Sequence, residues 1–188
     1  MLIYLHGFNS SPRSHKAQVL RQAMEERGLG VRFACPALPH WPEQALAAAE
    51  RELLAQPRDF VSLVGSSLGG FYATCLAERH GVRAVLINPA TEPHVGLRAW
   101  LGAQQNPYTG ERYELTEEHL EQWQRQSVAQ VHPERYLLLV ETGDEVLDYR
   151  VAVKRYRGAR QVVVQGGDHS LATFPAHIPR ILEFAGFA

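Results

Sequence analysis

The stretch Phe60-Val-Ser-Leu-Val-Gly-Ser-Ser-Leu-Gly-Gly70 predicts a buried strand that leads through a tight turn directly into a helix. The apolar run before Gly65 is typical of a strand inside a parallel sheet, and the helical segment continues to His80, with Gly81 as its stop. The turn has the pattern G-x-S-x-G, centred on Ser67. Small residues on both sides of a serine permit a turn tight enough to expose the serine hydroxyl. Ser67 is therefore the candidate nucleophile.

Two other functions of glycine-rich turns do not fit this stretch. A phosphate-binding loop needs Lys followed by Ser or Thr after its last glycine, but Gly70 is followed by Phe71 and Tyr72. A dinucleotide-binding turn needs a glycine where Ser67 stands. The N–H of Leu68 lies at the start of the predicted helix, where free N–H groups and the helix dipole stabilise negative charge. We interpret it as one donor of an oxyanion hole.

Short apolar runs alternate with segments of helical spacing along the rest of the chain. Strands that are apolar on both faces are typical of a parallel sheet with helices on both sides. We therefore predict a single α/β domain spanning residues 1–188, a three-layer α/β/α sandwich with a mostly parallel sheet of about six strands. The predicted strands are Leu2 to Leu5, Val31 to Cys35, Phe60 to Val64, Ala84 to Ile87, Tyr136 to Val140 and Gln161 to Val164. The predicted helices cover Ala17 to Met24, Pro42 to Leu53, Leu68 to His80, Tyr149 to Tyr156 and Ile178 to Ala185.

One long insertion, residues 88–134, interrupts this alternation between two predicted strands. It is polar, contains several aromatic residues and has one clear helix signal, with Thr116 as N-cap and Leu115 and Leu120 spaced as a hydrophobic staple. An insertion of this length at the carboxyl edge of a sheet is often a lid or a pocket wall. We predict a lid-like insertion, with a surface excursion that only packs against the domain as the alternative.

Composition excludes several classes of protein. The 188 residues include 19 basic and 20 acidic ones, for a formal net charge of -1, so no overall field attracts nucleic acid. The two cysteines, Cys35 and Cys75, fit a reduced compartment better than a disulfide framework. The chain starts with an apolar run too short for a signal peptide and has no apolar run of the ~20 residues that span a membrane. We therefore expect a cytoplasmic protein that binds no nucleic acid and has no membrane span.

A serine nucleophile needs a histidine base and an orienting carboxylate. His169 follows the last predicted strand, and Asp144 follows the strand before it, so both are expected at the carboxyl edge of the sheet. Asp148 stands where it would cap the next helix. The order Ser67, Asp144, His169 matches the order expected of an α/β-hydrolase. No histidine pair has a familiar zinc-binding spacing, so we expect neither a metal nor another cofactor.

The remaining candidate residues surround this predicted centre. Gly7 allows close backbone approach, so the N–H of Phe8 in the loop after the first strand is the expected second oxyanion donor. His6 is a rival base, but it lies too near the strand end to be preferred over His169, and we interpret it as an organiser of the loop. The candidates for the substrate pocket are His6, His40, Trp41, Trp100 and Tyr108, with Tyr113 and Trp123 as further aromatic residues that could line an acyl site.

The motifs together resemble the YqiA/YcfP-like group of small bacterial esterases, and the resemblance covers essentially the whole chain. It implies an α/β-hydrolase fold that lacks the first antiparallel strands, with Ser67, Asp144 and His169 as the triad and with acyl esters, including acyl thioesters, as substrates. The motifs that carry it are His6-Gly-Phe-Asn-Ser-Ser-Pro, Gly65-Ser-Ser-Leu-Gly-Gly, Asn88-Pro-Ala, Gln105-Asn-Pro-Tyr-Thr-Gly, Thr142-Gly-Asp-Glu-Val-Leu-Asp-Tyr and Gly166-Gly-Asp-His.

We therefore predict a serine esterase that hydrolyses small-molecule acyl esters through an acyl-enzyme intermediate. An acyl-CoA thioesterase with the same triad is the nearest alternative, because the same chemistry accepts a sulfur ester. The alternative from another class is a catalytically silent binding protein that kept the fold. The sequence specifies neither the physiological substrate nor an oligomeric state.

Overall fold

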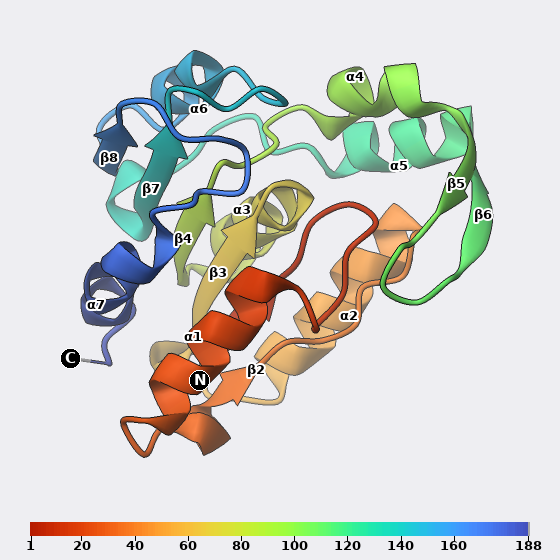
Figure 1. Cartoon of the computed structure of the whole chain (residues 1–188). Coiled ribbons are helices and arrows are strands. Elements are labelled where there is room, and N and C mark those ends of the chain that lie inside the picture. Colours follow the sequence, from red (N-terminus) through yellow and green to blue (C-terminus); the bar gives the residue numbers. More distant parts are fainter. Residues whose placement is uncertain (188) are drawn as a thin grey trace.

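Six parallel strands form the central sheet of the computed structural model, which describes residues 1–187. Every neighbouring pair in this sheet is parallel, so the carboxyl ends of all six strands lie along one edge (Figure 1). The order across the sheet is β2 (Phe33–Ala34), β1 (Leu2–Leu5), β3 (Ser62–Ser66), β4 (Arg83–Ile87), β7 (Tyr136–Glu141) and β8 (Arg160–Val164). The predicted sheet is confirmed.

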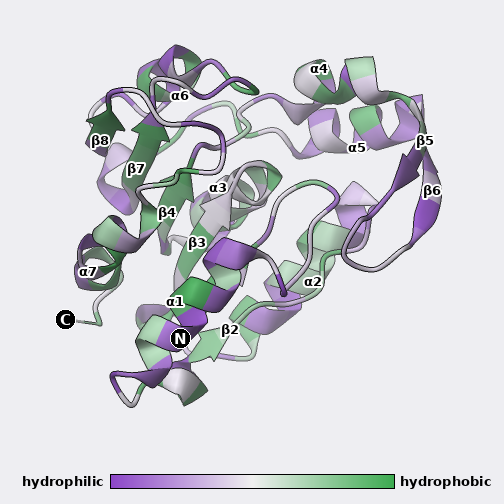
Figure 2. Cartoon of the chain, viewed as in Figure 1, coloured by the Kyte–Doolittle hydropathy of each residue, from purple (hydrophilic) through white to green (hydrophobic). Residues whose placement is uncertain are grey.

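Helices cover both faces of the sheet, which confirms the three-layer α/β/α architecture (Figures 1 and 2). Successive residues of β1 alternate between the two cores: Leu2 and Tyr4 belong to one, and Ile3 and Leu5 to the other. Because both faces are buried, the inner strands are mostly apolar, whereas the edge strand β8 is partly exposed and begins with Arg160 and Gln161. One face carries α1 (His15–Glu25) and α7 (Phe174–Phe184), and the other carries α2 (Pro42–Leu54), α3 (Leu68–His80) and α6 (Tyr149–Arg155).

The insertion folds into two short helical segments, a hairpin and one longer helix. Thr116 precedes the longer helix, as predicted, and both Leu115, before the helix, and Leu120, within it, are buried. The two-stranded antiparallel hairpin was not predicted, because Gly-Ala-Gln-Gln has no apolar alternation and the alternating stretch Arg-Tyr-Glu-Leu is only four residues long. The elements are α4 (Pro93–Gly96), the 3₁₀ helix η3 (Leu97–Trp100), β5 (Gly102–Gln105), β6 (Arg112–Leu115) and α5 (Glu117–Gln126).

Two predicted strands begin later than their apolar runs. Val31 lies in a 3₁₀ turn, η1 (Gly30–Arg32), and Phe60 lies in another, η2 (Arg58–Phe60). Their exposed fractions are 89% and 64%, whereas Leu63 in the paired part of β3 is fully buried. A residue of an apolar run belongs to the strand only if it pairs with a neighbouring strand. Here the first residues of both runs lie instead in the turn that leads into the strand. A third turn of this kind, η4 (Pro133–Arg135), precedes β7. Within residues 1–187, no helix is both long enough and apolar enough to cross a bilayer.

Paired substitutions in this run test the corrected strand boundary. Leu63→Ala is expected to lower the free energy of unfolding by about 2 to 5 kcal/mol, because it leaves a cavity in the core. Phe60→Ala is the matched control and should change it by no more than about 0.5 kcal/mol, because its side chain is mostly in solvent. Urea unfolding of the two variants measures both values. Equal losses would contradict the placement of Phe60 outside the sheet.

Candidate active site

Ser67 occupies the turn between β3 and α3 in a backbone conformation that is unusual for a residue with a side chain. Its φ is 54° and its ψ is -120°. Its N–H donates to the carbonyl oxygen of Ile87 (3.0 Å), and its own carbonyl oxygen accepts from the N–H groups of Gly70 (2.9 Å) and Ala90 (3.0 Å). These bonds hold the strained turn in place at the carboxyl edge of the central strand.

The turn exists because glycines let α3 approach the sheet closely. A Cβ on Gly65 would overlap the backbone of Gly69, and a Cβ on Gly69 would overlap the carbonyl group of Leu5 in β1. Both positions therefore require glycine, independently of any catalytic role. The same packing brings Gly7, in the loop after β1, next to the side chain of Ser67: a Cβ on Gly7 would lie 3.3 Å from Ser67 Cβ.

The structure brings the side chains of Ser67, His169 and Asp144 into contact at this edge. His169 Nε2 lies 3.0 Å from Ser67 Oγ, and His169 Nδ1 lies 2.8 Å from Asp144 Oδ2 and 3.0 Å from Oδ1. A carboxylate can only accept, so Nδ1 carries the proton in the neutral ring and Nε2 is free to accept the Ser67 hydroxyl proton. The three residues come from the ends of three different strands.

Asp144 is held as a charged acceptor. Its side chain is 1% exposed, and its Oδ1 accepts from the N–H groups of Val146 (2.9 Å) and Leu147 (2.8 Å). Burial by itself would raise the pKa of Asp144, but the hydrogen bonds from His169 and from these two N–H groups outweigh it, and the pKa lies below the usual range. Asp148 caps α6 through the N–H of Arg150 (3.0 Å), as predicted for it.

Two buried side chains, neither of them predicted as a site residue, hold the loop that carries His169. The carboxylate of Glu141, fully buried at the end of β7, accepts from the N–H of Asp168 (2.8 Å) and from the hydroxyl of Thr173 (2.6 Å). Asn88 Nδ2 donates to the His169 carbonyl oxygen (3.1 Å), and Asn88 Oδ1 accepts from the N–H of Glu141 (3.1 Å). A charged residue at the end of an otherwise apolar strand was the available signal for Glu141.

Two backbone N–H groups beside Ser67 have no acceptor within residues 1–187. They belong to Phe8, in the loop after β1, and to Leu68, the first residue of α3. The loop of Phe8 is held by His6, whose Nε2 accepts from the N–H of Leu38 (3.1 Å) while Nδ1 lies 3.1 Å from the Gly7 carbonyl oxygen. Burial lowers the pKa of His6, so its ring stays neutral and acts as a link within the loop.

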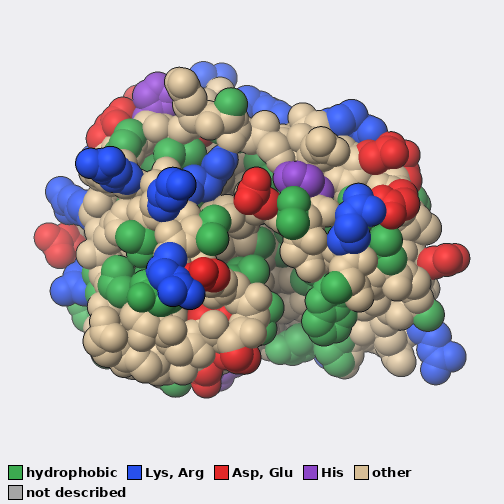
Figure 3. Space-filling view, turned by 90° about the horizontal axis from the view of Figure 1, so that it is seen from above, with side chains coloured by type: hydrophobic (Ala, Val, Ile, Leu, Met, Phe, Trp, Pro, Cys, Tyr) green, Lys and Arg blue, Asp and Glu red, His purple; other side chains and the backbone are tan. Residues whose placement is uncertain are grey.

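Two cavities meet at Ser67 and share Phe8 and His169 as lining residues. One is mostly apolar and measures about 400 Å³; the other is more polar and measures about 670 Å³. Figure 3, a view from above this edge, shows hydrophobic side chains around the hollow between two raised parts of the surface. Side chains that line the apolar cavity include Leu68, Val95, Leu97, Trp100, Leu147 and Val151. Those that line the polar cavity include Ser10, Ser14, His15, Lys16, Tyr108 and Glu145.

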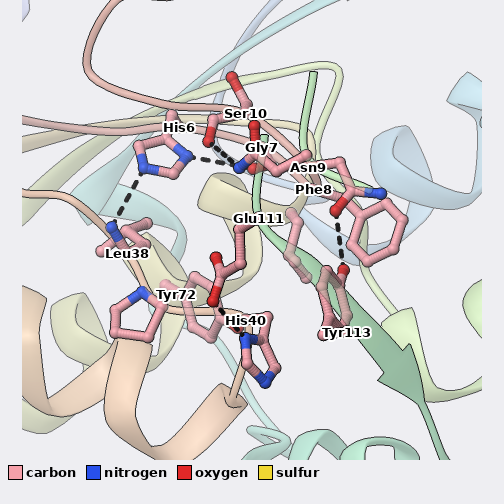
Figure 4. A pocket seen from close by; sticks show the side chains of 13 residues that line it. His6, Gly7, Phe8, Asn9, Ser10, Leu38, His40, Tyr72, Glu111 and Tyr113 are labelled. Carbon is pink, nitrogen blue, oxygen red and sulfur yellow. Dashed lines mark hydrogen bonds and ion pairs between the residues drawn. The ribbon is translucent and has the colours of Figure 1, made fainter. Parts of the chain in front are cut away.

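The predicted pocket residues are distributed over three places. Trp100 lines the apolar cavity and Tyr108 the polar one. His6 and His40 line a third, much smaller cavity behind the loop of Phe8, shown in Figure 4. Trp41 lines none of the three and stacks on the ring of His119, with centroids 3.9 Å apart.

The two further aromatic residues lie away from the Ser67 cavities. Tyr113 lines the small third cavity, and Trp123 is buried in the core, where its Nε1 donates to the hydroxyl of Tyr72 (2.9 Å). Within residues 1–187, no three histidine, cysteine or carboxylate side chains lie close enough together to hold a metal ion.

Known proteins resemble this chain over its whole length. The model of UPF0227, described as an uncharacterised protein family, matches residues 1–186. The UPF0227 protein of Serratia proteamaculans (strain 568) is 26% identical over 189 residues, which cover 98% of each chain. Mouse alpha/beta hydrolase domain-containing protein 10 has a TM-score of 0.77 at 16% identity, over 98% of this chain and 89% of that one. Est1E from Butyrivibrio proteoclasticus has a TM-score of 0.68 at 16% identity, over 98% and 88%.

At these low identities the solved structures establish only the fold, and the match to the family model establishes the family to which the chain belongs. The chain therefore has the α/β-hydrolase fold and belongs to UPF0227, the YqiA/YcfP family.

Proposed function

We propose that this protein is a serine esterase that hydrolyses carboxylic (acyl) esters. The observation that carries the proposal is the unbroken contact from Ser67 Oγ through the His169 ring to the buried carboxylate of Asp144. A serine hydroxyl alone is a poor nucleophile at neutral pH, and an imidazole that accepts its proton makes it reactive. The carboxylate holds the ring in the tautomer whose Nε2 can accept and stabilises the cation that then forms.

The reaction proceeds in two steps of acyl transfer. His169 Nε2 takes the proton of Ser67 while Oγ attacks the ester carbonyl carbon, and the N–H groups of Phe8 and Leu68 stabilise the oxyanion. His169 then gives the proton to the leaving oxygen, the bond between the acyl carbon and that oxygen breaks, and the acyl group remains on Ser67. A water molecule then attacks the acyl carbon while His169 takes its proton; the bond between the acyl carbon and Ser67 Oγ breaks, His169 returns the proton to Oγ, and the carboxylic acid leaves. No cofactor is needed for these steps.

The two cavities support a division of the substrate at Ser67. The apolar cavity suits the acyl chain, because its walls are aliphatic and aromatic side chains such as Leu97, Trp100 and Val151. The polar cavity suits the leaving alcohol, because it presents hydroxyl groups and the ammonium group of Lys16, which donates to the Ser170 carbonyl oxygen (2.6 Å). The esterases and hydrolases that share this fold support the same chemistry.

The nearest alternative is an acyl-CoA thioesterase that uses the same residues. Matched oxygen and sulfur esters with one acyl chain separate the two, because the enzyme's natural leaving group should give the higher kcat/KM. A catalytically silent binding protein is disfavoured, because a protein that only binds has no need of a serine, a histidine and a buried carboxylate in hydrogen-bonding contact.

Removal of the nucleophile tests the proposal directly. Ser67→Ala is expected to lower kcat for p-nitrophenyl esters by about 10⁴-fold or more and to abolish labelling by a fluorophosphonate probe. Ser62→Ala is the matched control, because Ser62 lies at the opposite end of β3, where its hydroxyl donates to the Ala185 carbonyl oxygen (3.1 Å). It should keep wild-type kcat. Wild-type protein that resists the probe, or Ser67→Ala with full activity, would refute the esterase assignment.

Acyl chain length tests the assignment of the apolar cavity. Each methylene buried there should raise kcat/KM about fourfold, from about 0.8 kcal/mol per methylene, until the cavity is full. Trp100→Ala should flatten this dependence on a series of p-nitrophenyl esters from acetate to decanoate, because it removes one wall of the cavity.

Tyr108→Ala is the comparison for the chain-length series. It removes an aromatic wall from the polar cavity and should leave the chain-length dependence as it is in the wild type. If Trp100→Ala kept the wild-type dependence, or if Tyr108→Ala flattened it, the acyl chain would not lie in the apolar cavity.

A further inference from the structure

The loop that carries the Phe8 N–H is held from outside by the β5–β6 hairpin of the insertion. The amide of Asn9 is bonded at both ends: its Nδ2 donates to Gln104 Oε1 (3.1 Å), and its Oδ1 accepts from the hydroxyl of Tyr113 (2.8 Å). Asn106 Nδ2 donates to the carbonyl oxygen of Ser10 (2.9 Å). Figure 4 shows the bond between Tyr113 and Asn9, beside the loop. Two consecutive loop residues are thus bonded to side chains from one hairpin.

Asn9, the residue directly after Phe8, has a backbone conformation that restricts the path of the loop on that side. It has a φ of 47°, in the left-handed region that residues with side chains seldom occupy. Asparagine adopts this region more readily than most residues do, but this property alone does not make it the preferred conformation of Asn9. The two hydrogen bonds to Gln104 and Tyr113 stabilise this conformation, and Phe8, with its free N–H, is the preceding residue.

The hairpin is itself packed and hydrogen-bonded at the point of contact. The ring of Tyr113 stacks on His40, with centroids 4.3 Å apart and an interplanar angle of 15°, and His40 Nδ1 lies 3.2 Å from Glu111 Oε1 on the same hairpin. Asn106 Oδ1 accepts from the N–H of Tyr108 (2.9 Å) and fixes the hairpin turn. Burial and the nearby charge of Glu111 raise the pKa of Tyr113 to about 12, so its hydroxyl remains protonated at neutral pH and can donate to Asn9.

The space between the hairpin and the loop is too small for a substrate. The cavity lined by His6, Leu38, Tyr72 and Tyr113 measures about 30 Å³, which is room for about one or two water molecules. The contact between the hairpin and the loop is therefore a packed one, and at Tyr113 the hairpin faces the back of the loop, whereas its turn reaches the polar cavity through Tyr108.

We infer that the β5–β6 hairpin is a brace for the oxyanion hole, with Tyr113 and Asn9 as positioning residues that aim the Phe8 N–H at the oxyanion. This inference rests on the proposed function, because an oxyanion forms only if Ser67 attacks a carbonyl group. It assigns this part of the insertion a role different from that of a moving lid. The brace stabilises the transition state and leaves binding of the ground-state ester unaffected.

Two single substitutions remove the brace without disturbing its surroundings. Tyr113→Phe keeps the stacked ring and removes one hydroxyl. Asn9→Gly keeps a residue suited to positive φ and removes the amide. Each should lower kcat about 10- to 100-fold, less than or equal to the loss of a whole oxyanion donor, with KM unchanged. Tyr149→Phe is the matched control, because it removes a tyrosine hydroxyl from α6, outside the hairpin and the lining of the Ser67 cavities, and should keep wild-type kcat.

A trifluoromethyl ketone with the preferred acyl chain reports on the oxyanion hole itself, since Ser67 adds to it to form a tetrahedral oxyanion. Its inhibition constant should rise in both brace variants by the factor by which kcat/KM falls. The acidic midpoint of the pH profile of kcat/KM should stay at the wild-type value, because within residues 1–187 no hydrogen bond joins the hairpin to His169 or Asp144. A variant that was only less stable, but still folded, would keep both the wild-type inhibition constant and the wild-type kcat/KM.

The double variant separates a shared mechanism from two independent ones. If Tyr113 and Asn9 act through the bond between them, Tyr113→Phe combined with Asn9→Gly should lose no more kcat than Asn9→Gly alone. Multiplied losses would mean that Tyr113 acts by another route and would overturn the brace.

The remaining outcomes are also decisive. Wild-type protein without Ser67-dependent hydrolysis would refute the proposed function first, and the brace with it. If the wild type is active, unchanged kcat and inhibition constants in both variants would refute the brace alone. A rise confined to KM would make the hairpin a wall of the substrate site instead, and failure of both variants to fold would reduce its role to stability; either result overturns the inference.

Discussion

The close approach of the first turn of α3 to the ends of β1 and β3 is the constraint on which the rest of this structure depends. It is possible only because Gly65 and Gly69 have no side chains: a Cβ on either would overlap backbone atoms. The approach holds Ser67 at positive φ and turns its hydroxyl out of the sheet edge. It also brings the loop after β1 against Ser67, so that one packing contact places the nucleophile and both free N–H groups together.

The opposite side of the site depends on buried polar groups rather than on close backbone packing. The carboxylate of Glu141 is fully buried, which would destabilise the fold strongly if it were unpaired. Donors from the loop of His169 surround it, so the loop and the carboxylate stabilise each other. Gly167 belongs to the same arrangement, since a Cβ there would overlap the Glu141 carboxylate. The backbone of the His169 loop is thereby held by Glu141, and the ring of His169 is held by Asp144.

The insertion serves both halves of the site in different ways. Its first part, with Trp100, forms a wall of the apolar cavity. Its hairpin bonds to the back of the loop that carries Phe8, and α5 anchors it to the domain through the buried side chains of Leu120 and Trp123. This segment, although polar in sequence, is therefore packed through hydrogen bonds and aromatic stacking as well as through a few buried apolar side chains.

What the sequence by itself determined was everything that depends on local pattern. The six apolar runs, the glycine-rich turn around Ser67 and the order of Ser67, Asp144 and His169 at strand ends can be recognised because parallel strands bring their carboxyl ends to one edge. The tertiary structure alone decided which distant residues meet. Asn9 and Tyr113 are 104 residues apart, and nothing local distinguishes Trp100 in the cavity wall from Trp123 in the core. Such contacts follow from how the layers pack, and no spacing along the chain encodes them.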